Sequence, residues 1–385
     1  MSDDQKTSIP SPGAHLLLLA VSLAPLAFPV HANALIILTA SLTVWVGSCR
    51  SIKPEPPSES MSKKDAMRFP IIGSAILLGL FLLFKFLPKE LVNRVLTLYF
   101  VLLGLLAVTS TLCPFITHLL PAEWGKREVK LPRISIPYLL KEPLDLEATM
   151  AELVSGVCSL PFCVWYFSSK HWTANNALGL AFSIQGIEHL SLGSVQTGAI
   201  LLSGLFFYDI FWVFFTPVMV SVAKSFDAPI KLLFPRLPAG SEKMPFAMLG
   251  LGDIVIPGIF VALMLRYDAS RHFKRKYFVS AFGGYVLGLG TTIAVMVIFN
   301  AAQPALLYIV PAVLGAVGAH AAIRNEFSEV FNFSESPDTK NAAANAAAQV
   351  SISDAVASSV APAGSHGRAA TQGTSTSHAV DRKND

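Results

Sequence analysis

Long apolar stretches separated by short polar ones fill most of the first 330 residues. A helix needs about 20 mainly apolar residues to cross the roughly 30 Å hydrocarbon core of a bilayer. Stretches close to that length, two of them shorter, occur at residues 33–49, 69–87, 95–121, 151–168, 175–191, 198–223, 245–266, 278–299 and 303–322. This pattern predicts an all-α, polytopic membrane protein with about nine transmembrane helices.

The composition supports the same class of protein. Hydrophobic residues make up 53% and charged residues 14% of the 385 residues, whereas soluble domains carry about 25% charged residues. A net charge of +4 therefore says little about nucleic acid, and we expect the lipid bilayer as a partner and no nucleic acid. The four cysteines lie in or beside apolar stretches without metal-like spacing, so we predict no disulfide framework and no metal site.

Basic residues are spread unevenly over the predicted loops. Loops 50–68, 122–150 and 266–277 contain five Lys or Arg residues each, and a nine-span chain places all three on one side. The loops of the opposite side contain seven in total. Because cytoplasmic loops carry an excess of Lys and Arg, the counts predict a cytosolic C-terminus and a lumenal or external N-terminus.

Both ends of the chain differ from the region between them. Residues 15–34 contain a short apolar run followed by Ala32-Asn33-Ala34, which has the A-x-A form of a signal-peptide cleavage site; the alternative is an uncleaved extra segment. From about residue 334 the chain is rich in Ala, Ser, Thr and Gly and too poor in apolar residues to fold. We therefore divide the chain into an N-terminal segment (1–34), a nine-span domain (35–330) and a disordered cytosolic tail (331–385).

Five ionisable residues fall inside the predicted spans, and two of them lie deep. Lys85, Glu152 and Glu188 are close to span ends, where a side chain can reach the interface. Asp209 and Asp253 are eight or more residues from either end of their spans. A charged residue at the centre of a span costs roughly 2.5–3.5 kcal/mol on insertion scales, which makes the two aspartates functional candidates.

Two prolines suggest that these aspartates lie at a similar depth. Pro217 follows Asp209 by eight residues, and Pro245 precedes Asp253 by eight. If the helices end and begin at these prolines, each acid lies about 12 Å from the same membrane face. Consecutive spans are antiparallel, so the two carboxylates can then face one another.

The residues around Asp253 favour an opened helix. Gly250 and Gly252 weaken the helix ahead of the acid and allow close approach of another chain. Pro257 lacks the N–H group that would bond to the carbonyl of Asp253. An opened backbone gives water and substrate a place to bind; the alternative is a kink that serves helix packing.

Two facing carboxylates that share one proton have the chemistry of an aspartic protease, in which one acid activates water and the other protonates the scissile amide. The competing class is a proton-coupled membrane transporter that uses the Asp209/Asp253 pair, because intramembrane acids also serve as proton relays. We find no internal repeat that would support a transporter.

Three short motifs carry a resemblance to a known family. Tyr208-Asp209, Gly250-Leu251-Gly252-Asp253 and Gln303-Pro304-Ala305-Leu306 resemble the YD, GxGD and PAL signatures of the GxGD intramembrane aspartyl proteases, in that family's order. Further stretches such as KHWTANNALGLAFS and AKSFDAPIKLLFP resemble the signal peptide peptidase family within it. The resemblance covers roughly residues 34–335.

This resemblance implies a presenilin-like fold and an intramembrane endopeptidase of the endoplasmic reticulum. Its expected substrates are transmembrane helical peptides, chiefly remnant signal peptides and type II-oriented membrane proteins. Asp209 and Asp253 are then the catalytic pair. The residues implied to shape the site or bind substrate are Tyr208, Gly250, Gly252, Gln303, Pro304, Ala305 and Leu306.

The resemblance implies neither a cofactor nor a metal ion, and it leaves a homo-oligomer open. Arg382 and Lys383, near the C-terminus, resemble a dilysine signal that returns proteins to the endoplasmic reticulum. Asn332-Phe333-Ser334 is a glycosylation sequon on the predicted cytosolic side, so we expect it to remain unmodified.

Overall fold

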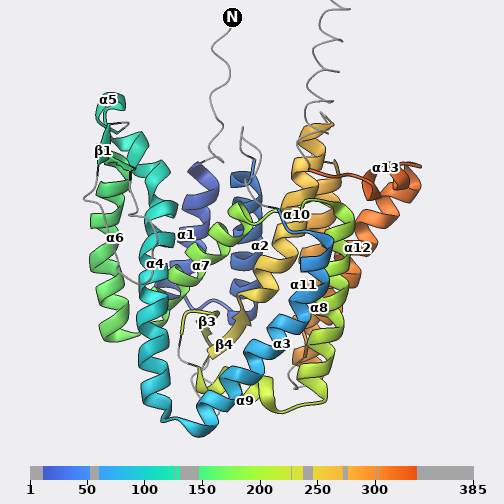
Figure 1. The fold of residues 1–385 in the computed structure, drawn as a ribbon, viewed down its shortest axis with the longest axis horizontal. Helices are drawn as coiled ribbons and strands as arrows, with labels where there is room; N and C mark the ends of the chain where they lie inside the picture. The colour runs from blue at the N-terminus through green and yellow to red at the C-terminus, as the bar shows by residue number, and fades with distance from the viewer. Residues whose placement is uncertain are drawn as a thin grey trace, which may run out of the picture. The chain divides into compact units, whose positions relative to one another are not determined.

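The structure is a computed structural model that describes residues 12–52, 60–125, 127–130, 147–226, 228–236, 246–271, 276–299, 301 and 303–335. Its helices are α1 (Pro12–Ala27), α2 (Ala32–Arg50), α3 (Lys63–Phe86), α4 (Lys89–Leu119), α5 (Ala122–Gly125), α6 (Met150–Ser169), α7 (Trp172–His189), α8 (Val195–Phe214), α9 (Val218–Ser225), α10 (Gly252–Ser270), α11 (Lys276–Phe299), α12 (Leu306–Ile323) and α13 (Phe327–Phe331). Strand β1 (Glu128–Lys130) pairs with β2 (Glu147–Thr149), and β3 (Lys231–Pro235) pairs with β4 (Phe246–Gly250), both antiparallel. The fold is all-α apart from these two hairpins (Figure 1).

Within the described residues, seven helices are long and apolar enough to cross a membrane: α2, α3, α4, α6, α8, α11 and α12. The protein is therefore a polytopic membrane protein. Seven of the nine predicted spans coincide with one helix each, and the other two, 198–223 and 245–266, do so only in part. The count of nine is not confirmed, because α7 and α10 are not among the helices long and apolar enough to span. Helix α7 contains Asn175, Asn176 and Glu188, and α10 contains Asp253 and Arg266.

Local sequence signals start two of the spanning helices. Ser62 caps α3, and its N–H is bonded in return by the side chain of Asp65. Thr149 and Glu152 form the same reciprocal capping box at the start of α6. Such a box satisfies two N–H groups that a helix start leaves free. The position of Glu152 at a span end, which we predicted, is confirmed.

The long helices alternate in direction, which brings the basic loops together. Helix α5, in the predicted loop 122–150, lies at the same end of the bundle as α13, and α9 lies at the opposite end (Figure 1). The start of α1 also lies at the end where α2 finishes. The described helix ends that border the loops grouped by charge therefore lie at one end of the bundle.

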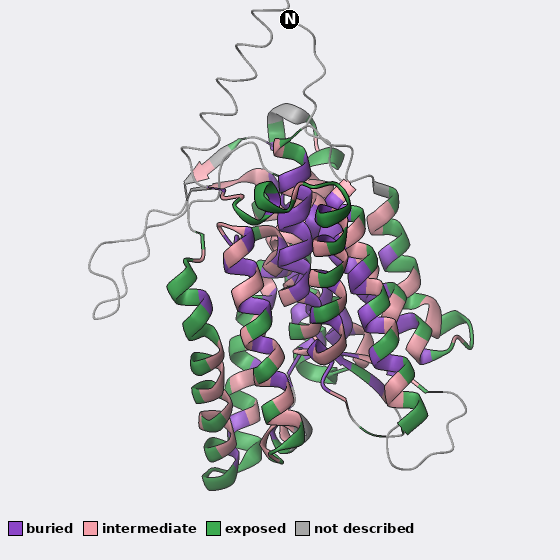
Figure 2. Ribbon diagram, turned by 90° about the vertical axis from the view of Figure 1, so that its right-hand side faces the viewer, coloured by how far each residue is buried: buried purple, intermediate pink, exposed green. Residues whose placement is uncertain are grey.

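Helix α10 is the centre of the packing, and α2, α7 and α11 surround it. Every residue from Ile259 to Leu265 is 4% exposed or less. A helix that is apolar on all sides needs such surroundings. By contrast, Leu98, Leu102 and Leu106 form an exposed stripe on α4, as expected of a lipid-facing surface. Figure 2 shows the same division between a buried centre and exposed outer helices.

Helices α11 and α12 approach each other backbone to backbone. A Cβ atom added at Gly284 would lie 2.6 Å from the carbonyl oxygen of Ala312, and one added at Gly288 would lie 2.6 Å from the Cα of Ile309. Two glycines four residues apart provide the close helix contact that is typical of membrane helices. No larger residue fits at either position without moving a backbone.

Two predicted spans differ from the structure beside the deep aspartates. The predicted span 198–223 is interrupted: α8 ends at Phe214, and α9 begins after Pro217. The predicted helix over 245–266 is wrong for its first residues, because 246–250 form strand β4 and α10 begins at Gly252. Ala247 and Leu249 are buried while the residues between and beside them are less so, which is the period of two of a strand rather than a helix.

Both ends of the described chain are packed against the helix bundle. Helix α1 packs on α2, and Ala32–Ala34, the predicted cleavage motif, lies in the first turn of α2. At the other end, Glu335 accepts hydrogen bonds from Arg266 and Ser191. The ordered chain therefore extends at least five residues beyond the boundary predicted at residue 330. Residues 336–385 of the predicted tail lie outside the described residues.

Candidate active site

Asp209 is held between two helices. It lies on α8, is 4% exposed, and its Oδ2 accepts a hydrogen bond of 3.0 Å from the N–H of Leu306. Leu306 is the first residue of α12, where the backbone N–H groups have no partner inside the helix. One buried contact therefore joins the first and third sequence motifs, since Asp209 ends the first and Leu306 ends the third.

Asp253 lies in the first turn of α10, directly after the β3–β4 hairpin, and is half-buried. Its Oδ2 faces Gly250, because a Cβ atom added there would lie 3.3 Å from that oxygen. At Gly252 the nearest atom to an added Cβ is Cδ1 of Ile256, at 3.9 Å, an ordinary contact. The absence of a side chain at Gly250 therefore makes room for the carboxylate, whereas Gly252 is not required for space.

Asp209 and Asp253 lie on helices α8 and α10, which are in contact. Asp209 is the charged group nearest in effect to the Asp253 carboxyl group, and the catalytic pairing of the two acids stays a prediction. The predicted start of the Asp253 helix at Pro245 is wrong, because α10 begins at Gly252; Pro245 itself lies outside the described residues. The depth of Asp253 can be measured from the other end of α10: it precedes Arg266 by 13 residues of helix, or about 20 Å.

The remaining predicted site residues differ in what they contact. The ring of Tyr208 contacts Trp212 and lies beside Gly73 of α3. Gln303 Oε1 accepts a hydrogen bond from the hydroxyl of Tyr308 at 3.3 Å. Pro304 and Ala305 are buried. Within the described residues, Leu306 is the one predicted site-shaping residue that donates a hydrogen bond to either aspartate.

Two asparagines that sequence reasoning missed hold the hairpin in front of Asp253. Asn176, which is 2% exposed, donates to the carbonyl of Leu233 at 2.8 Å and accepts from its N–H at 2.8 Å. Asn175 donates to the carbonyl of Lys231 at 2.7 Å. The signal was present in KHWTANNALGLAFS, where two adjacent amides occur in an otherwise apolar segment.

The β3–β4 hairpin connects the two asparagines to the chain segment that leads into Asp253. Leu233 of β3 pairs with Met248 of β4, and Leu251 N–H bonds to the carbonyl of Ile230 at 2.9 Å. Two residues after Leu251 the chain reaches Asp253. Irregular backbone at membrane depth requires its polar groups to be paired within the protein. The pairs to Ile230, Met248 and the asparagines meet that requirement.

The site offers carboxylates, backbone N–H groups and apolar walls. Within the part of the chain that the structure describes, no three His, Cys, Asp or Glu side chains come together as a metal-binding group. The chemistry that these side chains can perform is proton transfer between two neighbouring acids.

Comparison with known proteins agrees with this geometry. A family model described as signal peptide peptidase matches residues 53–337. The chain is 46% identical to the signal peptide peptidase of Mus musculus over 84% of this chain and 88% of that protein, and 47% identical to that of Homo sapiens over 78% and 82%. It is 34% identical to a probable intramembrane protease of Schizosaccharomyces pombe, over 78% and 94%.

The polytopic helical fold and the family match define an intramembrane protease of the aspartic type. The chain belongs to the signal peptide peptidase family. These comparisons give no support to the transporter alternative.

Proposed function

We propose that Asp209 and Asp253 are the catalytic pair and that the enzyme hydrolyses peptide bonds within transmembrane helices. The expected substrates are remnant signal peptides and type II-oriented membrane proteins, in keeping with the names of the mouse and human relatives. The single observation that carries the proposal is the packing of α8 against α10, because these two helices carry Asp209 and Asp253.

Two adjacent carboxyl groups hold one proton between them, because like charges at close range disfavour double ionisation. The ionised group accepts a proton from water as the water oxygen forms a bond to the scissile carbonyl carbon. The protonated group donates its proton to the carbonyl oxygen, which gives a tetrahedral diol. Collapse of the diol breaks the C–N bond: one diol hydroxyl returns its proton to the ionised group as the new carbonyl forms, and the leaving nitrogen takes a proton from the protonated group. The pair ends the cycle with the one proton it began with.

The neighbouring residues support this chemistry in distinct ways. The Leu306 N–H fixes one oxygen of Asp209, so that the other oxygen remains available to the second acid and the substrate. Gly250 leaves space for the Asp253 carboxylate. We propose that Tyr208, Gly252, Gln303, Pro304 and Ala305 shape the walls around the pair.

The test is cleavage of a type II-oriented signal-peptide helix by purified enzyme in proteoliposomes, with products identified by mass spectrometry. Asp209→Asn and Asp253→Asn, measured separately, should each reduce the rate by at least roughly a thousandfold. Asp268→Asn is the matched control, because Asp268 is also buried on α10 but accepts the N–H groups of Tyr277 and Phe278. Near-normal cleavage by either Asp209→Asn or Asp253→Asn would refute the pair.

We also propose an endoplasmic-reticulum location with the basic end of the bundle in the cytosol. The support is the excess of Lys and Arg in the loops at that end and the Arg382-Lys383 ending. The predicted lumenal N-terminus applies to a chain that begins with α2, and the division into 1–34, 35–330 and 331–385 remains a prediction.

The orientation is tested at Asn332, which accepts a hydrogen bond from Gln196 and lies in the sequon at the proposed cytosolic end. Treatment of the protein from microsomes with an endoglycosidase should leave its mass unchanged. A glycan at Asn332 would reverse the proposed topology. Whether the enzyme forms a homo-oligomer, which the sequence leaves open, is a separate question that light scattering of the detergent-solubilised enzyme would answer.

A further inference from the structure

The hydroxyl group of Tyr285 is a buried polar group that the fold does not use. Tyr285 lies on α11 and is 0% exposed. Its hydroxyl oxygen has no hydrogen-bond partner within the described residues. Buried hydroxyls usually have a partner, and those without one often lie at functional sites. A phenylalanine would fill the same space without leaving a donor unsatisfied.

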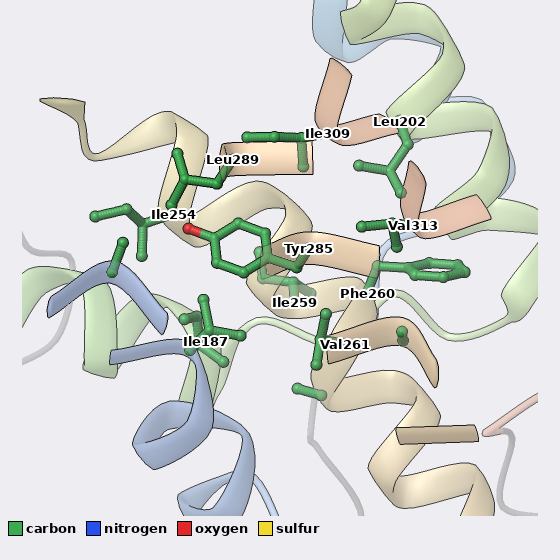
Figure 3. Packing of buried hydrophobic residues seen from close by; sticks show 14 of the residues in the cluster. Ile187, Leu202, Ile254, Ile259, Phe260, Val261, Tyr285, Leu289, Ile309 and Val313 are labelled. Carbon is green, nitrogen blue, oxygen red and sulfur yellow. The ribbon is translucent and has the colours of Figure 1, made fainter. Parts of the chain in front are cut away.

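The hydroxyl of Tyr285 points toward the first turn of α10. Figure 3 shows its oxygen directed at Ile254 and Leu289. Ile254 directly follows Asp253 in the first turn of α10, and Asp253 is the charged group that acts on Tyr285. The unpartnered donor therefore lies on the side of α11 that faces the turn carrying Asp253.

Other charged groups on the elements packed around α11 are engaged elsewhere. Asp268 of α10 accepts the N–H groups of Tyr277 and Phe278 at the start of α11. Arg266 pairs with Glu335, and His320 of α12 contacts Ser280. On α2, Arg50 pairs with Glu188. Within the described residues, Asp253 is the one charged group that acts electrostatically on Tyr285.

We propose that Tyr285 is a positioning residue of the active site, whose hydroxyl donates a hydrogen bond to the carboxyl group of Asp253 during catalysis. This inference rests on the catalytic pair proposed above. A donor from α11 would fix one oxygen of Asp253, as the Leu306 N–H fixes one oxygen of Asp209. Each acid would then have one oxygen held by the protein and one free to exchange protons with its partner, water and substrate.

The helix that carries Tyr285 is held firmly in place. That helix is locked against α12 through Gly284 and Gly288, which flank Tyr285 in the sequence. The start of α12 supplies the Leu306 N–H. One helix pair therefore presents a donor to each of the two acids, and catalytic groups need such rigid support to keep their geometry.

The test is Tyr285→Phe, which removes only the hydroxyl. We expect kcat to fall roughly tenfold with KM unchanged, as for loss of one hydrogen bond to a charged group. The acidic limb of the pH–rate profile should move to higher pH by roughly one unit, because the ionised acid loses a donor. Tyr267→Phe is the matched control: Tyr267 is also 0% exposed but lies 14 residues after Asp253 on α10, about 21 Å along the helix. Its kcat and pH profile should match those of the wild type.

An unchanged unfolding temperature of Tyr285→Phe, measured in parallel, shows that any loss of kcat does not come from loss of the fold. A wild-type kcat and pH profile for Tyr285→Phe would overturn the role of Tyr285. If Asp209→Asn and Asp253→Asn both abolish cleavage, such a result leaves the catalytic pair intact; if either cleaves normally, the pair itself fails.

Discussion

The side-chain amide of Asn176 pairs with the backbone of Leu233 as a neighbouring strand would, donating to its carbonyl and accepting from its N–H, both at 2.8 Å. This contact satisfies the outer edge of β3 inside an apolar bundle, where water cannot do so. It also fixes the hairpin that leads directly into Asp253. An amide on α7 thus determines the position of an acid on α10.

Replacing Asn176 by Leu should therefore destabilise the enzyme and slow it. Both backbone groups of Leu233 lose their partner, and we expect the free energy of unfolding to fall by about 2–4 kcal/mol. Asn175→Leu is the matched control, because that side chain makes one such bond, to the Lys231 carbonyl, and should cost about half as much. Thermal unfolding in detergent measures both. Equal unfolding temperatures for Asn176→Leu and the wild type would show that the hairpin does not depend on this clamp.

The two glycines of the Gly250-Leu251-Gly252 segment should differ in their tolerance of a methyl group. At Gly250 the added Cβ would press on Oδ2 of Asp253 at 3.3 Å, so Gly250→Ala should lower kcat by roughly tenfold or more through a small displacement of the acid. At Gly252 the added Cβ meets Ile256 at 3.9 Å, and Ala is a better helix former than Gly. Gly252→Ala should lower kcat by no more than about twofold. Steady-state cleavage kinetics distinguish the two, and a reversed order would contradict this account of the site.

The ion pair between α2 and α7 should be important for stability rather than catalysis. Arg50 Nε lies 2.7 Å from Glu188 Oε2, and the two side chains are 7% and 10% exposed. Removing one member of a buried pair leaves an uncompensated charge. Glu188→Gln should therefore lower the free energy of unfolding by about 3 kcal/mol, near the low end for such pairs, because Arg50 keeps its bonds to the Ser110 and Thr111 carbonyls.

A double variant separates the charge effect from packing. Arg50→Met combined with Glu188→Met removes both charges and should recover most of the stability that Glu188→Gln loses. Cleavage per folded enzyme should remain normal in both variants. If Glu188→Gln unfolds at the wild-type temperature, the pair is not a stabilising element.

The C-terminal limit of the folded domain can be located by truncation. Glu335 accepts from Arg266 at 2.5 Å and from Ser191 at 2.6 Å, and its N–H donates to the Gly193 carbonyl at 2.7 Å. A chain ending at residue 330 loses all of these contacts and should unfold at a temperature lower by several degrees. A chain ending at residue 337 should unfold as the full chain does. Identical unfolding temperatures for the two truncations would return the boundary to residue 330.

The sequence alone points to Asp209 and Asp253 as the candidate site, but it does not predict the local backbone around them. An acid in an apolar span is costly wherever the helix begins, so Asp209 and Asp253 were evident without coordinates. The strand over 246–250 was not, because FAMLG reads as part of a continuous apolar run. Short buried strands and buried helices have the same composition, and only their partners distinguish them.

Contacts between segments far apart in the sequence could not be predicted from the sequence either. Glu188 was expected at the membrane interface, yet it pairs with Arg50, 138 residues earlier. Tyr285 carried no signal, because a tyrosine within GGYVLGLG is read as a packing aromatic. Its unpartnered hydroxyl becomes visible only when α10 and α11 are placed side by side.

The glycine contact between α11 and α12 has a consequence for how mutations far from the acids would act. Gly284 and Gly288 touch the backbone of the neighbouring helix, so no flexible side chain can absorb a displacement. Inserting one residue into either helix would rotate the rest of it by about 100° and destroy that fit. The Leu306 N–H would leave Asp209 at the same time. The family should therefore accept length changes in the loops beyond Ser270 and Ile323 far more readily than in these two helices.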